Sequence, residues 1–108
     1  MEETYKREIV QRVIRNLLDV QILRLIRAQP MWGYKIKKQT EARFGVKLRH
    51  GALYPMLNML EKESFLTSHE ERRGGRTRKV YSITNKGEVY VDAYDAVLRE
   101  QLERKDLE

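Results

Sequence analysis

Cationic side chains concentrate in one short stretch of the sequence, around a pair of glycines. Five of the eight residues in 72–79 are arginine or lysine, and Gly74-Gly75 lies among them. Because a tight turn needs positive φ at both central residues, this pair predicts a hairpin with Arg73 and Arg76 at its tip. Cations at such a tip repel one another unless phosphates or a narrow minor groove neutralise them. The stretch therefore predicts contact with DNA; protection of a hairpin edge against aggregation is the alternative interpretation.

The segment 51–63 is a second candidate for contact with nucleic acid, because its apolar residues follow a helical period. Its apolar side carries Leu53, Met56, Leu57 and Leu60. On the other side, Gly51 and Ala52 allow a duplex to approach closely, while Tyr54 offers a hydroxyl to a phosphate. Asn58 provides an amide that suits an adenine edge. An ordinary amphipathic helix with a tolerant solvent face is an equally good interpretation.

Two further groups of residues precede this segment. Four cations flank the expected turn before it: Lys35, Lys38, Lys47 and Arg49. We expect them either to hold the DNA backbone or to be solvated. Trp32 and Tyr34, next to Gly33, are expected to pack the N-terminal helix against the body. Trp32 is also a candidate for stacking against a small ligand.

The residue types that most enzymes and metal sites require are scarce. The 108 residues include no Cys and only two His, His50 and His69, which stand apart without a serine or carboxylate constellation. No glycine-rich phosphate loop is present. No apolar run reaches the roughly 18–20 residues of a membrane span, and the charged N-terminus does not resemble a signal peptide. We therefore expect a cytoplasmic protein with no enzyme activity, cofactor, metal site or membrane contact.

The net charge of +6, from 22 Lys and Arg against 16 Asp and Glu, is unevenly distributed. Residues 1–87 carry 19 positive and 9 negative side chains, a balance of +10, whereas 88–108 carry 3 and 7, a balance of −4. A basic body concentrates polyanions, and nucleic acid is the commonest of these inside cells. Double-stranded DNA is therefore the expected partner.

The N-terminal part of the chain has apolar residues spaced by three and four over 5–27. This period predicts either one long helix or two helices joined near Asp19. Asn16 or Asp19 would cap the second helix. Pro30 ends the element because proline lacks the backbone N–H that a helix needs.

Two shorter helices are expected next. The first covers 34–44 and ends at Gly45, which suits the left-handed conformation after a helix. The second covers 51–63 and starts at residue 50 or 51, because Pro55 is tolerated only near a helix start.

Two β-leaning runs, 65–71 and 78–84, lie on either side of the glycine pair. They predict a two-stranded hairpin, and Thr84 or Asn85 can cap a final helix over 86–105. The expected fold is mainly α with a small β-hairpin, a winged helix-turn-helix with long N- and C-terminal dimerisation helices.

We expect one domain over 1–108, because a second core is improbable in a chain of this length. The DNA-binding body and wing would cover about 17–85, and the C-terminal dimerisation helix 86–106. No internal repeat, low-complexity linker or domain boundary is evident.

The two terminal helices carry an apolar stripe that the three-helix body leaves uncovered. Such a stripe is expected to find a second copy of the chain, which predicts a homodimer. Folding back of the last helix on the first helix of its own chain is the alternative. The predicted dimerisation residues are Ile9, Val13, Leu17, Tyr90, Tyr94, Val97, Leu98 and Leu102.

Four motifs resemble the PadR family of transcriptional regulators over about 17–88. They are Gly33-Tyr34-Lys35-Ile36, Gly51-Ala52-Leu53-Tyr54-Pro55-Met56-Leu57, Leu60-Glu61-Lys62-Glu63, and Gly75-Arg76-Thr77-Arg78-Lys79-Val80-Tyr81-Ser82-Ile83-Thr84 with Lys86-Gly87. The Leu-Tyr-Pro element followed by a Gly-Arg wing is specific in combination.

The resemblance implies a winged-helix repressor that binds a palindromic operator as a homodimer and is released by a small molecule or another signal. It implies that Tyr34, Tyr54 and the helix with Gly51 and Ala52 face DNA. It also implies that the Gly75-Arg76 wing reaches phosphates or the minor groove, and that the first and last helices dimerise.

Two features set this chain apart within the resemblance. Ser64 stands where the family usually carries Gly, so a residue with a side chain must take the conformation that ends the helix. The C-terminal segment is a single helix, as in the short branch of the family. An effector pocket would therefore lie at the dimer interface, bounded by the first and last helices and Trp32.

Together these patterns predict a sequence-specific, homodimeric DNA-binding repressor with an unidentified small-molecule effector. A protein-interaction or small-molecule-sensing module with only non-specific DNA affinity is the alternative. The predicted DNA-binding residues are Tyr34, Lys35, Lys38, Arg49, His50, Gly51, Ala52, Tyr54, Asn58, Arg73, Arg76 and Arg78.

Overall fold

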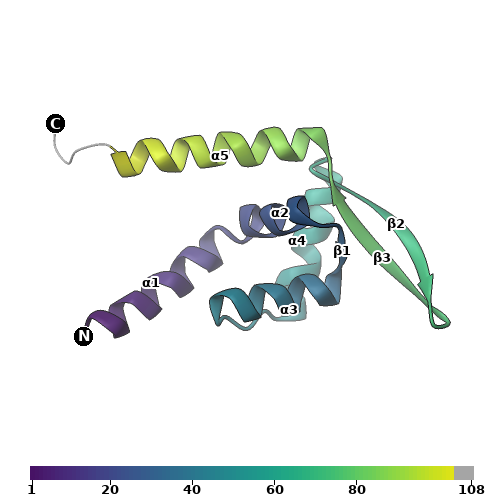
Figure 1. The fold of residues 1–108 in the computed structure, drawn as a ribbon, viewed down its shortest axis with the longest axis horizontal. Helices are drawn as coiled ribbons and strands as arrows, with labels where there is room; N and C mark the ends of the chain where they lie inside the picture. Colours follow the sequence, from purple (N-terminus) through teal and green to yellow (C-terminus); the bar gives the residue numbers. More distant parts are fainter. Residues whose placement is uncertain (104–108) are drawn as a thin grey trace.

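The structure is a computed structural model that describes residues 1–103, except for the side chain of His50. Its elements are α1 (Glu2–Asn16), α2 (Leu18–Ala28), β1 (Met31–Trp32), α3 (Gly33–Phe44), α4 (His50–Lys62), β2 (Leu66–Arg73), β3 (Arg76–Ile83) and α5 (Asn85–Glu103) (Figure 1). The predicted mainly α, winged-helix fold is confirmed. The expected end of the last helix, at 105–106, lies outside the described residues.

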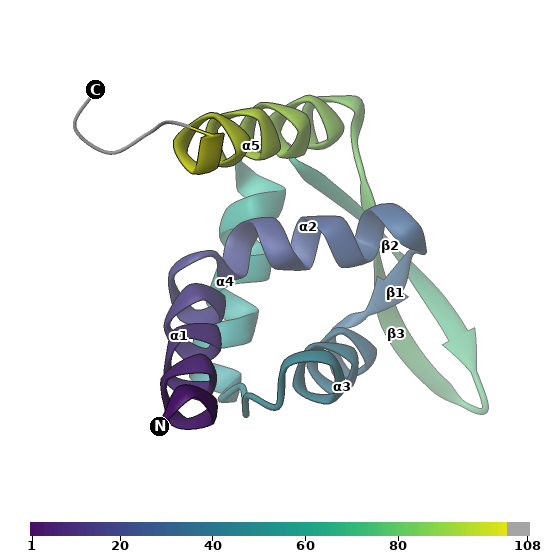
Figure 2. The ribbon, with the colours of Figure 1, turned by 60° about the vertical axis from the view of Figure 1, so that its left-hand side comes forward.

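The N-terminal segment is two helices, one of the two predicted alternatives, and they separate at Leu17, two residues before Asp19. Leu17 leaves the helical conformation, with φ −113° and ψ 26°. Neither predicted cap forms, because the amide of Asn16 donates to the carbonyl of Arg12 (2.9 Å) and the carboxylate of Asp19 accepts from the N–H of Val20 (2.8 Å). The break turns α1 away from the direction of α2 (Figure 2).

The sheet has three antiparallel strands, in the order β1-β3-β2, rather than the two predicted. Met31 pairs with Tyr81, and Trp32 pairs with Val80. A strand of two residues directly after Pro30 is too short to show an alternating pattern, which explains why the sequence did not predict it. Met31 and Tyr81 are both buried, so β1 fastens the base of the β2–β3 hairpin to the core.

The β2–β3 hairpin is the wing, and its turn has the predicted geometry. Gly74 and Gly75 have φ values of 57° and 76°. Arg73 pairs with Arg76 across the turn, so both arginines lie at the tip. The tip projects well beyond the helical body (Figure 1).

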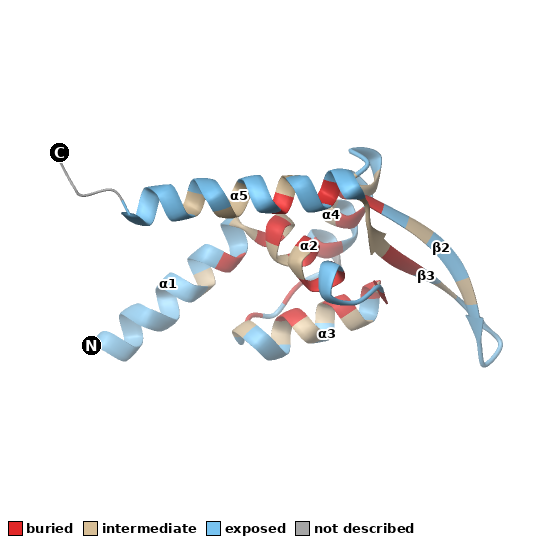
Figure 3. Ribbon diagram, turned by 45° about the horizontal axis from the view of Figure 1, so that its top comes forward, coloured by how far each residue is buried: buried red, intermediate tan, exposed pale blue. Residues whose placement is uncertain are grey.

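The core is built around α2 and α4. Ile22, Leu23 and Ile26 of α2 meet Leu53 and Leu57 of α4, and all five are fully buried. Buried residues gather in this central region, whereas most of α1 and the far half of α5 are exposed (Figure 3). The core therefore fixes α4 and the base of the wing and leaves the terminal helices with open faces.

The link between α4 and the wing requires an unusual backbone conformation. Ser64 has φ 67°, as the departure from glycine at this position predicted. The N–H groups of Ser64 and Phe65 donate to the carbonyls of Glu61 (3.0 Å) and Leu60 (2.9 Å), which is the Schellman pattern of helix termination. The backbone thus turns sharply from α4 into β2.

Thr84 joins α4 to α5 and confirms the predicted cap. Its hydroxyl accepts from the N–H of Gly87 at 3.0 Å, which caps α5. The same hydroxyl lies 2.6 Å from the carbonyl oxygen of Ser64 and 3.1 Å from that of Phe65. One side chain therefore connects the end of the fourth helix with the start of the fifth.

The first half of α5 packs on α2 of its own chain, so part of the stripe predicted to be uncovered is covered. Asp95 forms an ion pair with Arg24, and Asp92 pairs with Arg27 at 3.0 Å. Val91 is fully buried.

No helix within residues 1–103 is long and apolar enough to cross a membrane.

Candidate nucleic-acid interface

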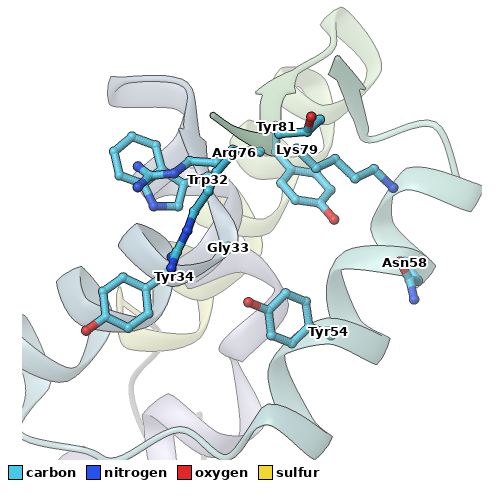
Figure 4. Close-up of a pocket in the computed structure, with 10 residues that line it drawn as sticks. Trp32, Gly33, Tyr34, Tyr54, Asn58, Arg76, Lys79 and Tyr81 are labelled. Atoms are coloured by element: carbon cyan, nitrogen blue, oxygen red, sulfur yellow. The ribbon is translucent and has the colours of Figure 1, made fainter. Parts of the chain in front are cut away.

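A hollow of about 690 Å³ lies between α3, α4 and the wing strand β3 (Figure 4). We name it the wing-side hollow. Its lining combines aromatic rings, cations and one amide: Trp32, Gly33, Tyr34, Tyr54, Asn58, Arg76, Thr77, Arg78, Lys79 and Tyr81. Six of the residues predicted to contact DNA or a ligand thus come together in one concave surface. They are Trp32, Tyr34, Tyr54, Asn58, Arg76 and Arg78.

Trp32 faces this hollow and does not pack the N-terminal helix against the body as predicted. Residues alternate along β1, so Met31 enters the core while Trp32 is half-buried on the opposite face. The guanidinium of Arg78 lies 4.6 Å from the centroid of the indole, and the ammonium of Lys35 lies 5.6 Å away. The ring therefore positions two cations by cation–π attraction.

Tyr34 also departs from the predicted packing role, since its side chain is 55% exposed. The ammonium of Lys38 lies 5.4 Å from its ring. Tyr54 projects from α4 toward the start of α3, where Gly33 leaves room for it. A Cβ atom at Gly33 would lie 2.8 Å from Cε1 of Tyr54, so glycine is needed for this close approach.

The wing arginines differ in their neighbours. The Nε of Arg73 lies 4.0 Å from Oε1 of Glu71. The other carboxylate oxygen of Glu71, Oε2, lies 2.7 Å from Nε2 of His69. Arg76 and Arg78 have no carboxylate oxygen within 4.0 Å in the described part of the chain. Two cations on the wing are thus available to a phosphate without first leaving an ion pair.

A polar contact that the sequence did not predict braces α4 against both wing strands. Glu61 of α4 accepts a hydrogen bond from the hydroxyl of Ser68 on β2 and pairs with the ammonium of Lys79 on β3 at 2.9 Å. The Ser68 hydroxyl and then Lys79 lower the pKa of Glu61, and the Glu61 carboxylate raises the pKa of Lys79. Both groups are therefore charged near neutral pH, and their attraction joins α4 to the wing.

The other predicted DNA-binding residues lie outside the wing-side hollow. Lys35 and Lys38 are on α3 and Arg73 is at the wing tip, whereas Arg49, His50, Gly51 and Ala52 are at the start of α4. Gly51 and Ala52 are exposed, and Arg49 occupies the N-cap position without a side-chain hydrogen bond to the helix. The N-terminal end of α4 thus lies at the surface, where the positive end of the helix dipole attracts anions. His50 belongs to this group, but its side chain lies outside the described residues.

The predicted dimerisation residues occupy the outer faces of α1 and α5. Ile9 is 57% exposed, and Val97 and Leu102 are 57% and 85% exposed. Tyr90 and Tyr94 are half-buried, since they also pack against the core, and Leu17 and Leu98 are half-buried as well. Val13 is exposed on α1.

An apolar hollow of about 290 Å³ lies on this outer face, lined by Tyr90, Ala93, Tyr94 and Val97. Trp32 is on the other side of the body, next to the wing. Within one chain Trp32 therefore lies apart from the apolar hollow on α5, because the unpredicted strand β1 carries it to the wing. An effector pocket at a dimer interface stays a prediction.

Comparisons with known proteins point to one family. The model of the "Transcriptional regulator PadR-like family" matches residues 22–93. An uncharacterized protein of Lysinibacillus sphaericus is 32% identical over 83 residues, which cover 73% of this chain and 75% of that protein.

Solved structures agree with these sequence matches. A PadR-like transcription factor from Bacteroides fragilis is 25% identical, with a TM-score of 0.75, over 89% of this chain and 93% of that one. A PadR family transcription regulator from Clostridium difficile R20291 is 25% identical, with a TM-score of 0.74, over 81% and 92%. The residues matched by the family model include the whole lining of the wing-side hollow.

Proposed function

Since the chain belongs to the PadR-like family of transcriptional regulators, which bind DNA, we propose that it is a homodimeric repressor of a palindromic operator. In each protomer α4 enters the major groove and the wing reaches the adjacent minor groove. The two α4 helices then lie about one helical turn of DNA apart. Repression follows from occupancy, because a dimer on two half-sites covers roughly 20 bp of promoter DNA.

The observation that carries this proposal is the wing-side hollow. A DNA strand that separates a major groove from the next minor groove must pass between the helix in one and the wing in the other. The hollow lies between these two elements and is lined by Arg76 and Arg78. Neither arginine has a carboxylate oxygen within 4.0 Å in the described part of the chain. Phosphates on this strand would meet Arg76, Arg78 and the hydroxyl of Tyr54, while Asn58 lies toward the base edges.

The dimer is supported by the shape of the protomer. Ile9 and Val13 on α1 and Val97 and Leu102 on α5 expose apolar side chains that the body does not cover. A second copy related by a twofold axis would bury the same faces of both chains. Such a twofold axis would match a palindromic operator.

Selection of bound fragments from a random DNA pool, repeated at two salt concentrations, tests the proposal. We expect enrichment of a palindrome with half-sites about one turn apart. Weak, salt-sensitive binding without an enriched sequence would contradict it and favour a module with only non-specific DNA affinity. A reporter gene behind the enriched sequence separates repression from activation.

Arg76→Ala tests the role of the wing on the selected duplex. We expect weaker binding to every sequence and a salt slope reduced by about 0.9, the contribution of one phosphate contact. Thr77→Ala, a neutral change beside it, is the control and should keep the slope. An unchanged slope for Arg76→Ala would show that Arg76 contacts no phosphate.

A further inference from the structure

We propose that a second basic groove, between α1 and the turn from α3 to α4, binds the DNA backbone on the side of α4 opposite the wing. This inference rests on the proposed function and extends it to α1, otherwise a dimerisation helix. We name the feature the turn-side groove. Figures 1 and 2 place α1 and the wing on opposite sides of the body.

Four cations line the turn-side groove, which has a volume of about 650 Å³. They are Arg15 of α1, Lys37 of α3, and Lys47 and Arg49 of the turn. None of the four has a carboxylate oxygen within 4.0 Å in the part of the chain that the structure describes. Like charges that converge without a counter-charge repel one another, so an anion in the groove would stabilise the arrangement.

One carboxylate, Glu41, also lines the groove. Its Oε2 accepts a hydrogen bond from the backbone N–H of Leu48 at 2.9 Å, and this bond shapes the turn. Leu48 is buried, so the bond directs the flanking residues Lys47 and Arg49 toward solvent, and both are exposed. The carboxylate thus helps to present cations, and the groove keeps an excess of three positive charges.

The groove continues along α1. A neighbouring hollow of about 360 Å³ shares Gln11 and Gly45 with it and adds Lys6 and Arg7, together with Glu3. The cations therefore form a strip that leads away from α4, which suits an extended polyanion better than a single small anion.

The position of the strip relative to α4 identifies the polyanion. A helix in the major groove has one phosphate strand on each side, since the groove is only about 12 Å wide. Tyr54 and Asn58 of α4 face the wing-side hollow, whereas Arg49, at the N-cap of the same helix, lines the turn-side groove. The two concave surfaces flank one helix, as the two strands flank one groove.

The proposal is tested with Arg15→Gln and Lys47→Gln on the selected duplex. We expect each change to reduce the slope of log K against log salt by about 0.9. Arg12→Gln removes the same charge from the same helix, but Arg12 is exposed and lines neither hollow, so its slope should be unchanged. Equal reductions of the salt slope for Arg12→Gln and Arg15→Gln would show that the slope depends on net charge alone, and would overturn the proposal.

Single methylphosphonate substitutions in the duplex locate the contacts. We expect two groups of sensitive phosphates per half-site, on opposite strands. Arg76→Ala should abolish sensitivity in one group, and Lys47→Gln in the other. Loss of the same group in both variants would contradict a separate turn-side contact.

Sedimentation and thermal unfolding of each variant separate DNA contact from other roles. Dissociation of the dimer by Arg15→Gln would place Arg15 in the dimer interface instead and would overturn the proposal. Failure of the wild-type protein to bind any duplex would refute the proposed function itself. Normal wild-type binding with unchanged slopes in both variants would refute the turn-side groove alone.

Discussion

Several side chains of the wing-side hollow are held in place by neighbours within the protein. The indole of Trp32 holds the guanidinium of Arg78, and Lys79 lies 5.4 Å from the ring of Tyr81 while it pairs with Glu61. Long cationic side chains lose rotamer freedom when they bind, at a cost of about 0.5–1.5 kcal/mol each. Contacts that order these side chains in the free protein reduce that cost and so favour binding of the proposed DNA.

Glu61 gives the brace between α4 and the wing a defined pH dependence. Its pKa is lowered from the ordinary value of 4.5, first by the Ser68 hydroxyl and then by Lys79. A carboxyl whose pKa is lowered on folding stabilises the protein above its unfolded pKa, and this contribution is lost as the pH falls through the folded pKa.

We therefore expect Glu61→Gln to be less stable at pH 7 by up to about 1 kcal/mol, because the pair is partly exposed. The difference from the wild type should shrink as the pH is lowered below 4.5. Urea unfolding at a series of pH values measures both effects, and Glu8→Gln, at an exposed position of α1, is the control. A difference that is constant with pH would contradict the brace.

Ser64 holds a conformation that costs free energy for a residue with a Cβ atom. Its φ is 67°, whereas Glu63, the residue before it, has φ −78°. Ser64→Gly should raise the free energy of unfolding by about 0.5–1 kcal/mol, because glycine adopts this region without steric cost. Glu63→Gly should lower it by a similar amount, since glycine there only adds freedom to the unfolded chain. Equal effects of the two changes would show that Ser64 is not strained.

At the scale of elements, the start of α5 is fixed by close contact with the end of α4. A Cβ atom at Gly87 would lie 2.3 Å from the backbone oxygen of Phe65 and 2.7 Å from Cγ1 of Ile83. The ring of Phe65 stacks on Tyr90 at 4.3 Å between centroids. Because a backbone atom cannot rotate aside as a side chain can, this junction has little room to adjust.

Gly87→Ala should therefore destabilise the fold by about 1–3 kcal/mol, the range for overpacking in a close-packed site. Glu88→Ala, an exposed position one residue further along α5, should change stability by less than about 0.5 kcal/mol. Denaturant unfolding of both variants measures the difference. Wild-type stability of Gly87→Ala would mean that α5 can move away from Phe65 at no cost.

Local signals predicted most of the elements from the sequence. Gly45 and the Gly74-Gly75 pair both have the positive φ expected of them, and Thr84 caps α5. Each of these residues acts on its own backbone within a few positions, so its effect can be inferred without the fold. The fourth helix begins at residue 50 as expected.

Features that depend on contacts distant in the sequence could not be predicted. Strand β1 exists because Met31 pairs with Tyr81, 50 positions away. For the same reason, the sequence does not predict that Trp32 faces the wing. The break at Leu17 keeps Ile14 and Leu18 buried on two helices of different direction, and only the packed core decides that position.

At the scale of the whole molecule, the protomer is too extended for a self-contained domain. Its radius of gyration is 15.8 Å, and its extents are 57 × 32 × 21 Å. A compact chain of this length has a radius of gyration of about 13 Å. The excess arises from α1 and the far half of α5 on one side and from the wing on the other, all of which project beyond the core (Figure 1). Association with a second copy would cover the surfaces that this shape exposes.

Val97→Glu tests the dimer without disturbing the core. Val97 is 57% exposed and borders the apolar hollow on α5. We expect the charge to raise the dimer dissociation constant at least about tenfold, because it must lose water in the interface, while the protomer stays folded. Val89→Glu, 68% exposed outside that hollow, is the control. Sedimentation velocity over a range of concentrations measures both variants, and an unchanged dimer in Val97→Glu would place the interface elsewhere.

The shared hydroxyl of Thr84 couples the start of α5 to the residues that follow the C-terminal end of α4. The 13 residues of this helix span about 20 Å at 1.5 Å per residue. A rotation of α5 by about 10° that α4 followed as a rigid body would move the N-terminal end of α4 by about 3.4 Å. That displacement is close to the 3.4 Å between successive bases of a strand. Under the proposed function, a small change in how two protomers meet would therefore shift the start of α4 along the DNA by about one base.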